Sequence, residues 1–238
     1  GSSRPKYLAE SMALGSHRYV NDIYADDMLF GALCFSEHPR ARILSIDISE
    51  ALASPGVNRI ITAADIPGNR LTGLIVKDWP MMIAVGEITH CIGDVLACIV
   101  ADTEQNARQA ASRLKIHYEP FEMVVDVRKA IMPGSPKVHD SRSNVLEECV
   151  ITQGHTQKAF ADAAFVSRRS FTTQRIEHAF LETESAVAMP EGDGILIYSQ
   201  GQGVYVDRQQ IASVLNLPLE MVRVIQVPNG GGFGGKED

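Results

Sequence analysis

The sequence has few cysteines and none of the cysteine spacings that are typical of a metal or redox site. No two of its four cysteines, Cys34, Cys91, Cys98 and Cys149, form a Cys-x-x-Cys pair. The N-terminal residues also lack the apolar core of a secretion signal. We therefore expect free buried thiols instead of disulfides, and no iron–sulfur or zinc site formed by this chain alone.

The sequence also lacks an excess of positive charge and a long apolar run. Its 29 acidic residues outnumber its 22 basic residues, giving a formal net charge of −7 at pH 7. Such a chain has no electrostatic footprint for nucleic acid or for an anionic membrane. No apolar run approaches the roughly 18 to 20 residues of a membrane span. We expect a cytoplasmic protein that binds neither nucleic acid nor a membrane.

What the sequence does have is enough apolar surface for a sizeable core. Hydrophobic residues make up 45% of its 238 residues, which is sufficient for one large domain or two smaller ones. There is no low-complexity tract and no internal repeat with a period of roughly 20 to 50 residues, which excludes solenoid architectures. The chain is therefore expected to be globular.

The first half of the chain alternates between strand-like and helix-like segments. Strands are predicted over residues 41–48, 57–62, 94–101 and 114–118, and a short helix over 49–54. The nearly continuous apolar run at 94–101 indicates a strand buried on both faces. A helix should follow, with Asp102 as N-cap and Gln105 three residues on. Its apolar face would carry Ala107, Ala110, Ala111 and Leu114.

The second half begins after IMPGSPK, residues 131–137, which is the best candidate for an interdomain linker. Beyond it we predict helices over 157–164 and 208–215, and strands over 165–171, 195–199 and 221–227. Strands and helices are mixed without a regular βαβ repeat. The predicted fold class is therefore α+β.

The last predicted strand leads into PNGGGFGGKED, which fits two phosphate-binding templates. Gly230, Gly232 and Gly235 match GxGxxG, while Gly230, Gly235 and Lys236 match the frame of a Walker loop. Glu237 stands where a Walker loop needs Ser or Thr, and the sequence contains no downstream βαβ unit for a Rossmann site. A glycine turn that only needs positive φ angles remains the alternative.

Several segments in order resemble one family. GGGFGGKED, together with SEHPRARILSIDISEAL, VGEITHCIGDVLACIVADTEQNARQAASRLKIHYE and RIEHAFLETESAVA, resembles the molybdopterin-binding subunit of the xanthine dehydrogenase and aldehyde oxidase family of molybdenum hydroxylases. The resemblance implies a hammerhead α/β domain over residues 15–125. It also implies the first, N-terminal portion of the molybdopterin-binding domain over residues 135–238.

The resemblance also assigns cofactor-binding residues. A glutamine beside the molybdenum corresponds to Gln202, with Gln200 as the alternative. Gly232, Phe233 and Gly234 correspond to the backbone segment that approaches the metal centre and the pterin. A neutral glutamine offers both a donor and an acceptor, so it can orient a ligand without adding charge to an anionic site. No metal ligand is expected from the protein, and Gln202 could also be an ordinary surface turn residue.

The resemblance gives Glu237 a role in substrate binding. In the purine-hydroxylating branch of the family, a glutamate at this position binds the substrate heterocycle. A carboxyl group can pair with ring N–H groups, which fits that role. A solvated surface glutamate is the alternative. The neighbouring pair Glu177 and His178 is predicted to pack and not to bind a metal, because adjacent strand residues point to opposite faces.

The implied function is hydroxylation of a purine or related N-heterocycle, with water as the oxygen source. The catalytic base of the family is a glutamate farther along the subunit, so no catalytic residue is assigned and the chain alone should be inactive and hold no molybdenum. Expected partners are the rest of the molybdenum subunit, subunits carrying FAD and 2Fe-2S clusters, and a small-molecule substrate, and a homo-oligomer is compatible with the sequence.

Three alternatives remain open. One is an aldehyde-oxidising member of the same family, and another is a non-catalytic scaffold or assembly module that keeps the hammerhead fold. The third is a small nucleotide-binding protein. The stretch VKDWPMMIAVGE favours the xanthine dehydrogenase side, including its selenium-dependent members.

Overall fold

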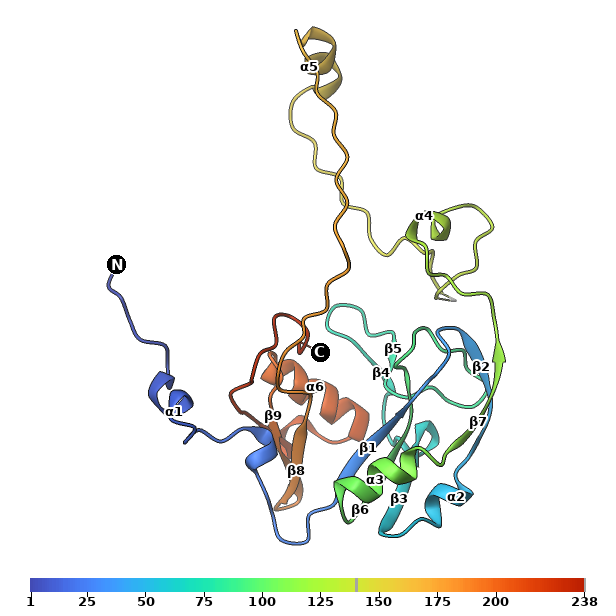
Figure 1. The fold of residues 1–238 in the computed structure, drawn as a ribbon, viewed down its shortest axis with the longest axis vertical. Coiled ribbons are helices and arrows are strands. Elements are labelled where there is room, and N and C mark those ends of the chain that lie inside the picture. Colours follow the sequence, from blue (N-terminus) through green and yellow to red (C-terminus); the bar gives the residue numbers. More distant parts are fainter. Residues whose placement is uncertain (140, 238) are drawn as a thin grey trace. The chain divides into compact units, whose positions relative to one another are not determined.

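The computed structural model describes residues 1–139 and 141–237, which divide into two compact units. One unit combines residues 1–121 with 178–238, and the other comprises residues 122–177. Every strand described belongs to the first unit (Figure 1). Helices and strands are mixed along the chain, so the predicted α+β class is confirmed.

The N-terminal half of the first unit is built from short antiparallel sheets. The main sheet has the order β1-β6-β3, formed by β1 (Phe30–Phe35), β6 (Val95–Ala101) and β3 (Val57–Thr62). The other strands are two pairs, β2 (Ala41–Asp47) with β7 (Lys115–Pro120) and β4 (Leu71–Thr72) with β5 (Trp79–Pro80). Its shorter helical elements are α1 (Ala9–Ala13), η1 (Val20–Asp22), α2 (Ser49–Leu52) and η2 (Ala63–Asp65). The strands predicted at 41–48, 57–62, 94–101 and 114–118 are all present.

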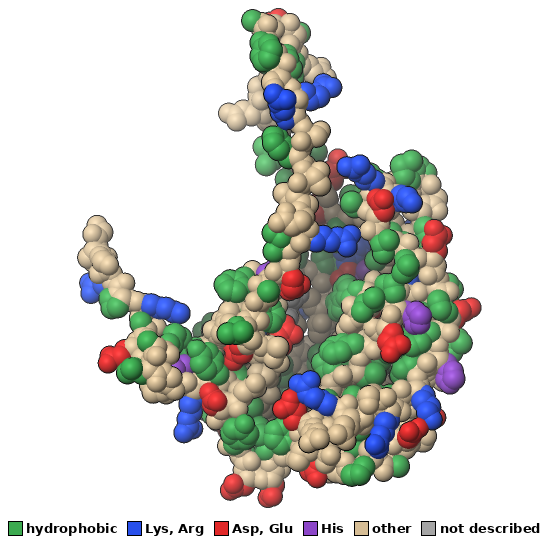
Figure 2. All heavy atoms as spheres, viewed as in Figure 1, with side chains coloured by type: hydrophobic (Ala, Val, Ile, Leu, Met, Phe, Trp, Pro, Cys, Tyr) green, Lys and Arg blue, Asp and Glu red, His purple; other side chains and the backbone are tan. Residues whose placement is uncertain are grey.

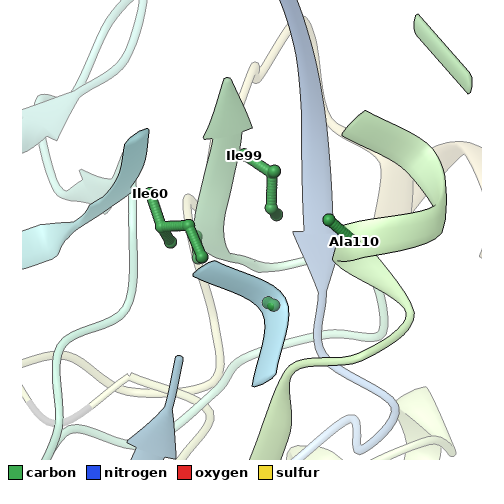
Figure 3. Packing of buried hydrophobic residues seen from close by; sticks show 5 residues of the cluster. Ile60, Ile99 and Ala110 are labelled. Carbon is green, nitrogen blue, oxygen red and sulfur yellow. The ribbon is translucent and has the colours of Figure 1, made fainter. Parts of the chain in front are cut away.

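The core of this half lies between the main sheet and two helices. Ile60 of β3 and Ile99 of β6 pack with Ala110 of α3 (Glu104–Ala111), as Figure 3 shows. Ile99 and Ala110 are fully buried. Alanine on the helix allows the helix axis to approach the sheet closely while the isoleucines fill the space. The apolar run of β6 and the alanine spacing of α3 therefore contribute to one buried cluster.

The start and end of α3 differ from the prediction. Thr103, not Asp102, is the N-cap, because its side chain accepts the Asn106 N–H at 3.1 Å. Asp102 instead accepts from the Asn106 side-chain amide at 2.7 Å. The helix ends at Ala111, and Leu114 packs against the core from beyond its end. Two adjacent polar residues compete for the cap, and backbone geometry decides between them.

The C-terminal half of the first unit is a second three-stranded sheet of order β10-β9-β8. Its elements are β8 (Ala186–Glu191), β9 (Gly194–Ser199), α6 (Val204–Leu215), η3 (Leu219–Met221) and β10 (Val222–Gln226). β8 and β9 form an antiparallel pair, whereas β9 and β10 are parallel and connected through α6. The helix packs Ala212 against Ile197 and Val222. It begins four residues before the predicted start, at Val204.

Apolar packing and backbone hydrogen bonds join the halves of the first unit. Val20 packs with Val187 of β8 and with Val227, the residue after β10. Backbone N–H groups of Gly68 and Asn69 donate to carbonyls in the last turn of α6, at 2.9 and 3.0 Å. The segment that follows β10 therefore starts from a buried, fixed position.

The second unit contains α4 (Val127–Ala130) and α5 (Thr156–Asp162). The helix predicted at 157–164 is confirmed with slightly earlier bounds. The strand predicted at 165–171 is wrong, because this segment has no regular secondary structure. Phe165 and Phe171 are 84% and 89% exposed. A strand needs a hydrogen-bonding neighbour, and no such neighbour pairs with this segment among the described residues.

The surface charge, the helices and the thiols can be compared with what the composition predicted. Figure 2 shows acidic and basic side chains interspersed over the visible face. None of the described helices combines the length and apolarity needed to cross a membrane.

All four cysteines are free, but the prediction that they are buried is wrong, because Cys149 is exposed and the other three are half-buried. Burial and the neighbouring Asp94 carboxylate raise the pKa of Cys91 to about 11, so this thiol stays protonated at neutral pH.

Truncation of the central core residue should destabilise the protein. We expect Ile99→Ala to lower the free energy of unfolding by about 2 to 5 kcal/mol, because it removes buried methyl groups and leaves a cavity. Ile75→Ala makes the same chemical change at a side chain that is 91% exposed, and should cost no more than about 0.5 kcal/mol. Chemical denaturation followed by circular dichroism measures both, and equal losses would contradict the assigned core.

Candidate functional site

The candidate site lies where the two parallel strands end. β9 leads into residues 200–203 and β10 leads into the glycine loop, which we define as residues 228–237. Because parallel strands end at the same edge of a sheet, the two segments are brought together. The Val227 N–H donates to the Ser199 carbonyl at 2.8 Å, and the Gln202 N–H donates to the Lys236 carbonyl at 2.7 Å. The loop is therefore anchored beside the start of α6 at both ends.

Gln202 is the exposed glutamine of this edge and it holds the middle of the loop. Its Oε1 accepts the N–H groups of Gly234 at 3.0 Å and Lys236 at 3.3 Å. Its Nε2 has no acceptor among the described residues. The side chain is thus fixed through its oxygen while its two amide hydrogens remain available to a ligand.

Gln200 has a different environment, although only one residue separates it from Gln202. It is 3% exposed, and its Nε2 donates to the Thr183 carbonyl and the Ser185 hydroxyl, both at 2.8 Å. Its Oε1 accepts from the Lys236 ammonium. Both ends of this amide are used inside the protein, so Gln200 has an internal bridging role.

At two glycines of the loop, an added side chain would collide with a neighbouring residue. A Cβ at Gly232 would lie 2.3 Å from Gln202 Oε1, and a Cβ at Gly230 would lie 2.6 Å from the Glu182 Cβ. Gly231 and Gly234 have φ angles of 110° and 92°, which side chains rarely allow. The loop can pack this closely against its neighbours only because the side chains are missing.

Phe233 has a backbone conformation that phenylalanine rarely adopts. It has a φ of 53°, in the left-handed region, and its ring is 73% exposed. Such a backbone costs about 1 to 3 kcal/mol and occurs mainly where surrounding contacts impose it. The N–H groups of Gly231, Gly232 and Phe233 have no acceptor among the described residues. At exposed Phe233 the loop therefore presents a backbone N–H and an aromatic ring together.

Lys236 is not available to a phosphate. It is 4% exposed, and its ammonium donates to the Glu182 carbonyl at 2.8 Å and to Gln200 Oε1. It also lies 3.8 Å from Glu182 Oε2 and 4.4 Å from the Phe180 ring centroid. A Walker lysine must instead reach into solvent towards a nucleotide. The geometry thus removes the physical basis of the Walker interpretation.

The loop ends at a polar residue, Glu237, and two further polar residues lie beside it. Glu237 is exposed, as substrate binding would require. Glu182, which sequence reasoning missed, accepts the Gly230 N–H at 2.6 Å, and no local pattern signals a contact between residues so far apart in sequence. His178 lies close to the loop, because a Cβ at Gly235 would be 3.2 Å from its Cγ. The prediction that Glu177 and His178 lie on a strand is wrong, since neither is in a strand.

A metal site made by side chains alone finds no support. Among residues 1–139 and 141–237, no group of three or more His, Cys, Asp or Glu residues is arranged to hold a metal ion. What the edge of the sheet provides is a neutral amide, backbone N–H groups and glycine surfaces. Such donors suit an anionic ligand.

Comparison with known proteins identifies this architecture. Residues 14–122 match the aldehyde oxidase and xanthine dehydrogenase a/b hammerhead domain, and residues 138–238 match the molybdopterin cofactor-binding domain. The chain belongs to the aldehyde oxidase and xanthine dehydrogenase family. The hammerhead fold implied by the sequence resemblance is thereby confirmed, as is the presence of a molybdopterin cofactor-binding domain.

Individual family members match nearly the whole chain. A probable xanthine dehydrogenase subunit of Bacillus subtilis is 30% identical over 99% of this chain, and the nicotinate dehydrogenase large molybdopterin subunit of Eubacterium barkeri is 31% identical over 100%. The chain spans 31% and 56% of these two relatives. The solved aldehyde oxidoreductase from Desulfovibrio gigas is 30% identical with a TM-score of 0.89, covering 98% of this chain and 27% of that one.

The residues of the family's cofactor domain fit a molybdopterin group. The glycine loop and Gln202 both lie in the matched domain. The absence of Cβ atoms at Gly230 and Gly232 permits the close packing of the loop. The N–H groups of Gly231 to Phe233 are donors suited to an anionic pterin.

A side chain at Gly232 should displace Gln202 without unfolding the protein. We expect Gly232→Ala to push Oε1 out of the loop, so that the Gly234 amide loses its acceptor and exchanges faster with solvent. NMR can follow both the Gln202 side-chain amide and the Gly234 amide.

The matched control for this substitution is Gly31→Ala. A Cβ at Gly31 makes only an ordinary 3.5 Å contact with Cys98 Sγ. This variant should leave both signals unchanged. Unaltered Gln202 and Gly234 signals in Gly232→Ala would show that the loop does not depend on this close approach.

Proposed function

We propose that this chain forms part of a molybdenum hydroxylase that hydroxylates a purine or related N-heterocycle with oxygen from water. The observation that carries the proposal is Gln202, whose Oε1 is fixed by the glycine loop while its Nε2 has no acceptor among the described residues. Family membership supports oxidoreductase chemistry of this class. The whole enzyme is proposed to act in the cytoplasm.

Gln202 and the loop backbone are proposed to bind the cofactor. When bound, the molybdopterin-type group supplies the redox-active metal for hydroxylation. Gln202 Nε2 would donate a hydrogen bond to a polar group of the bound cofactor, and because the amide is neutral it would orient that group without electrostatic repulsion. The N–H groups of Gly232 and Phe233 would hold the cofactor from the side of the loop, and the Phe233 ring would shield it there from water. Gln200, the alternative, has no free amide hydrogen to offer.

Glu237 is proposed to bind the substrate. It is exposed and follows directly after buried Lys236, so its backbone position is fixed while its carboxylate remains accessible. A carboxylate accepts hydrogen bonds from the ring N–H groups of a purine, and hydrogen bonds to a charged group are stronger than those between neutral groups. A simple aldehyde has no ring N–H, so Glu237 should discriminate between the two substrate classes.

The proposed enzyme needs components beyond these residues. The catalytic base is assigned to a glutamate of the remaining molybdenum subunit, and electrons are expected to leave through 2Fe-2S and FAD partners. The names of two relatives, one a xanthine dehydrogenase subunit and one a large molybdopterin subunit, support an enzyme of several subunits. On this proposal the 238-residue chain alone is inactive.

An aldehyde-oxidising enzyme is the second candidate. It is favoured by the similarity to the solved aldehyde oxidoreductase from Desulfovibrio gigas. Both candidate functions use the same cofactor contacts. They differ in whether Glu237 binds the substrate. Substrate preference, not cofactor content, therefore separates them.

The decisive test compares two substrates in the complete enzyme. The full subunit is expressed with its redox partners, and hydroxylation of xanthine and of an aldehyde is measured with isotopically labelled water. We expect Glu237→Ala to reduce kcat/KM for xanthine by roughly 10- to 100-fold, because a hydrogen bond to a charged group is lost, and to affect the aldehyde much less.

Glu191→Ala is the matched control. Glu191 is a surface carboxylate paired with Arg223 at 2.7 Å, so its loss should leave both activities unchanged. Equal losses on the two substrates in Glu237→Ala would rule out substrate recognition by this residue. Turnover of the aldehyde alone would favour the second candidate.

A further inference from the structure

Lys236 is a buried cation in a loop made largely of glycine. Its side chain is 2% exposed, and its ammonium contacts the Glu182 carbonyl, Gln200 Oε1 and the Phe180 ring. Burying an ammonium is strongly unfavourable unless hydrogen bonds and an opposite charge compensate for it. The surroundings of Lys236 supply both, so the end of the glycine loop is tied to the segment at residues 180–182.

Glu182 provides the opposite charge and ties down the beginning of the same loop. Its Oε2 accepts the Gly230 N–H at 2.6 Å and lies 3.8 Å from the Lys236 ammonium. Its side chain is 14% exposed, and its buried Oε1 has no partner among the described residues. One carboxylate therefore faces the first glycine of the loop and the cation near its end.

We propose that Glu182 and Lys236 form a buried ionic latch that sets the backbone of the glycine loop. Both are positioning residues, acting through the loop and not by touching substrate. The link from the latch to cofactor binding rests on the proposed function. The effect of the latch on the conformation of the loop is independent of that function.

The latch accounts for the strained backbone inside the loop. With Gly230 and Lys236 both tied to the segment at 180–182, the residues between them must turn within a short span. The Phe180 ring limits that span from one side, because a Cβ at Gly235 would lie 3.0 Å from it. Phe233 is thereby held in the left-handed region. Release of either end would allow Phe233 to relax and the hydrogen bonds to Gln202 to open.

Amide hydrogen exchange of the 238-residue chain tests the latch directly. Glu182→Gln keeps the shape of the side chain but leaves the Lys236 charge buried without its counterion. We expect the backbone N–H groups of Gly234 and Gln202, neither of which touches Glu182, to exchange with solvent at least about tenfold faster. The Val227 amide, bonded to Ser199 at 2.8 Å, should keep its protection.

A double-substitution cycle separates the ionic contribution from packing. Lys236→Met alone leaves the Glu182 carboxylate buried without a cation, whereas Glu182→Gln with Lys236→Met removes both charges. We expect the double variant to exchange more slowly at Gly234 than the two single effects combined would give. Lys115→Met, which removes an exposed partner of Glu50, should leave loop exchange unchanged.

Three results would overturn the latch. The two substitutions could act additively, the faster exchange could be confined to Gly230, or Val227 could lose protection together with the loop. The last result would mean that the pair stabilises the sheet and not the loop. The second and third results can be read from Glu182→Gln even if Lys236→Met alone fails to fold.

Molybdenum content of the complete enzyme separates the latch from the proposed function. If both hold, Glu182→Gln should lower the molybdenum bound per subunit, measured by elemental analysis, while Lys115→Met retains it. Faster loop exchange with full molybdenum content would leave the latch in place and contradict the cofactor role of the loop.

Discussion

The parallel pairing of β9 with β10 is the constraint on which the candidate site depends. It brings two segments together that are separated by a whole helix, the turn after β9 and the loop after β10. Helix α6 makes the crossover possible because Ala212 packs against Ile197 and Val222 of the two strands. Without this register, Gln202 and Gly234 would not lie within hydrogen-bonding distance of each other.

The loop itself is shaped as much by missing side chains as by contacts. A Cβ at Gly232 would lie 2.3 Å from Gln202 Oε1, and a Cβ at Gly230 would lie 2.6 Å from the Glu182 Cβ, so either added side chain would displace its neighbour. The loop that packs in this way lies within the matched cofactor-binding domain. Lys236 is internal because its ammonium is bonded to the Glu182 carbonyl and Gln200 Oε1 and lies over the Phe180 ring.

Much of the fold was predictable because local pattern and tertiary environment agree. The apolar run of β6 and the alanine face of α3 require each other, and the structure pairs them. The sequence-based predictions are wrong where the local preference of a segment competes with its tertiary environment. Thr103 replaced Asp102 at the helix cap, and residues 165–171 form no strand although their composition favours one. A strand depends on a neighbour, and sequence pattern alone does not supply it.

The sequence by itself determined the strands and helices of the core, the need for glycine after β10, and the resemblance that family comparison then confirmed. Tertiary structure alone decided which glutamine offers its amide, that Lys236 is buried, and that Glu182 belongs to the loop. The physical reason is distance along the chain. Periodicity reports which face of an element is apolar, whereas a buried ion pair forms between residues that only the completed fold brings together.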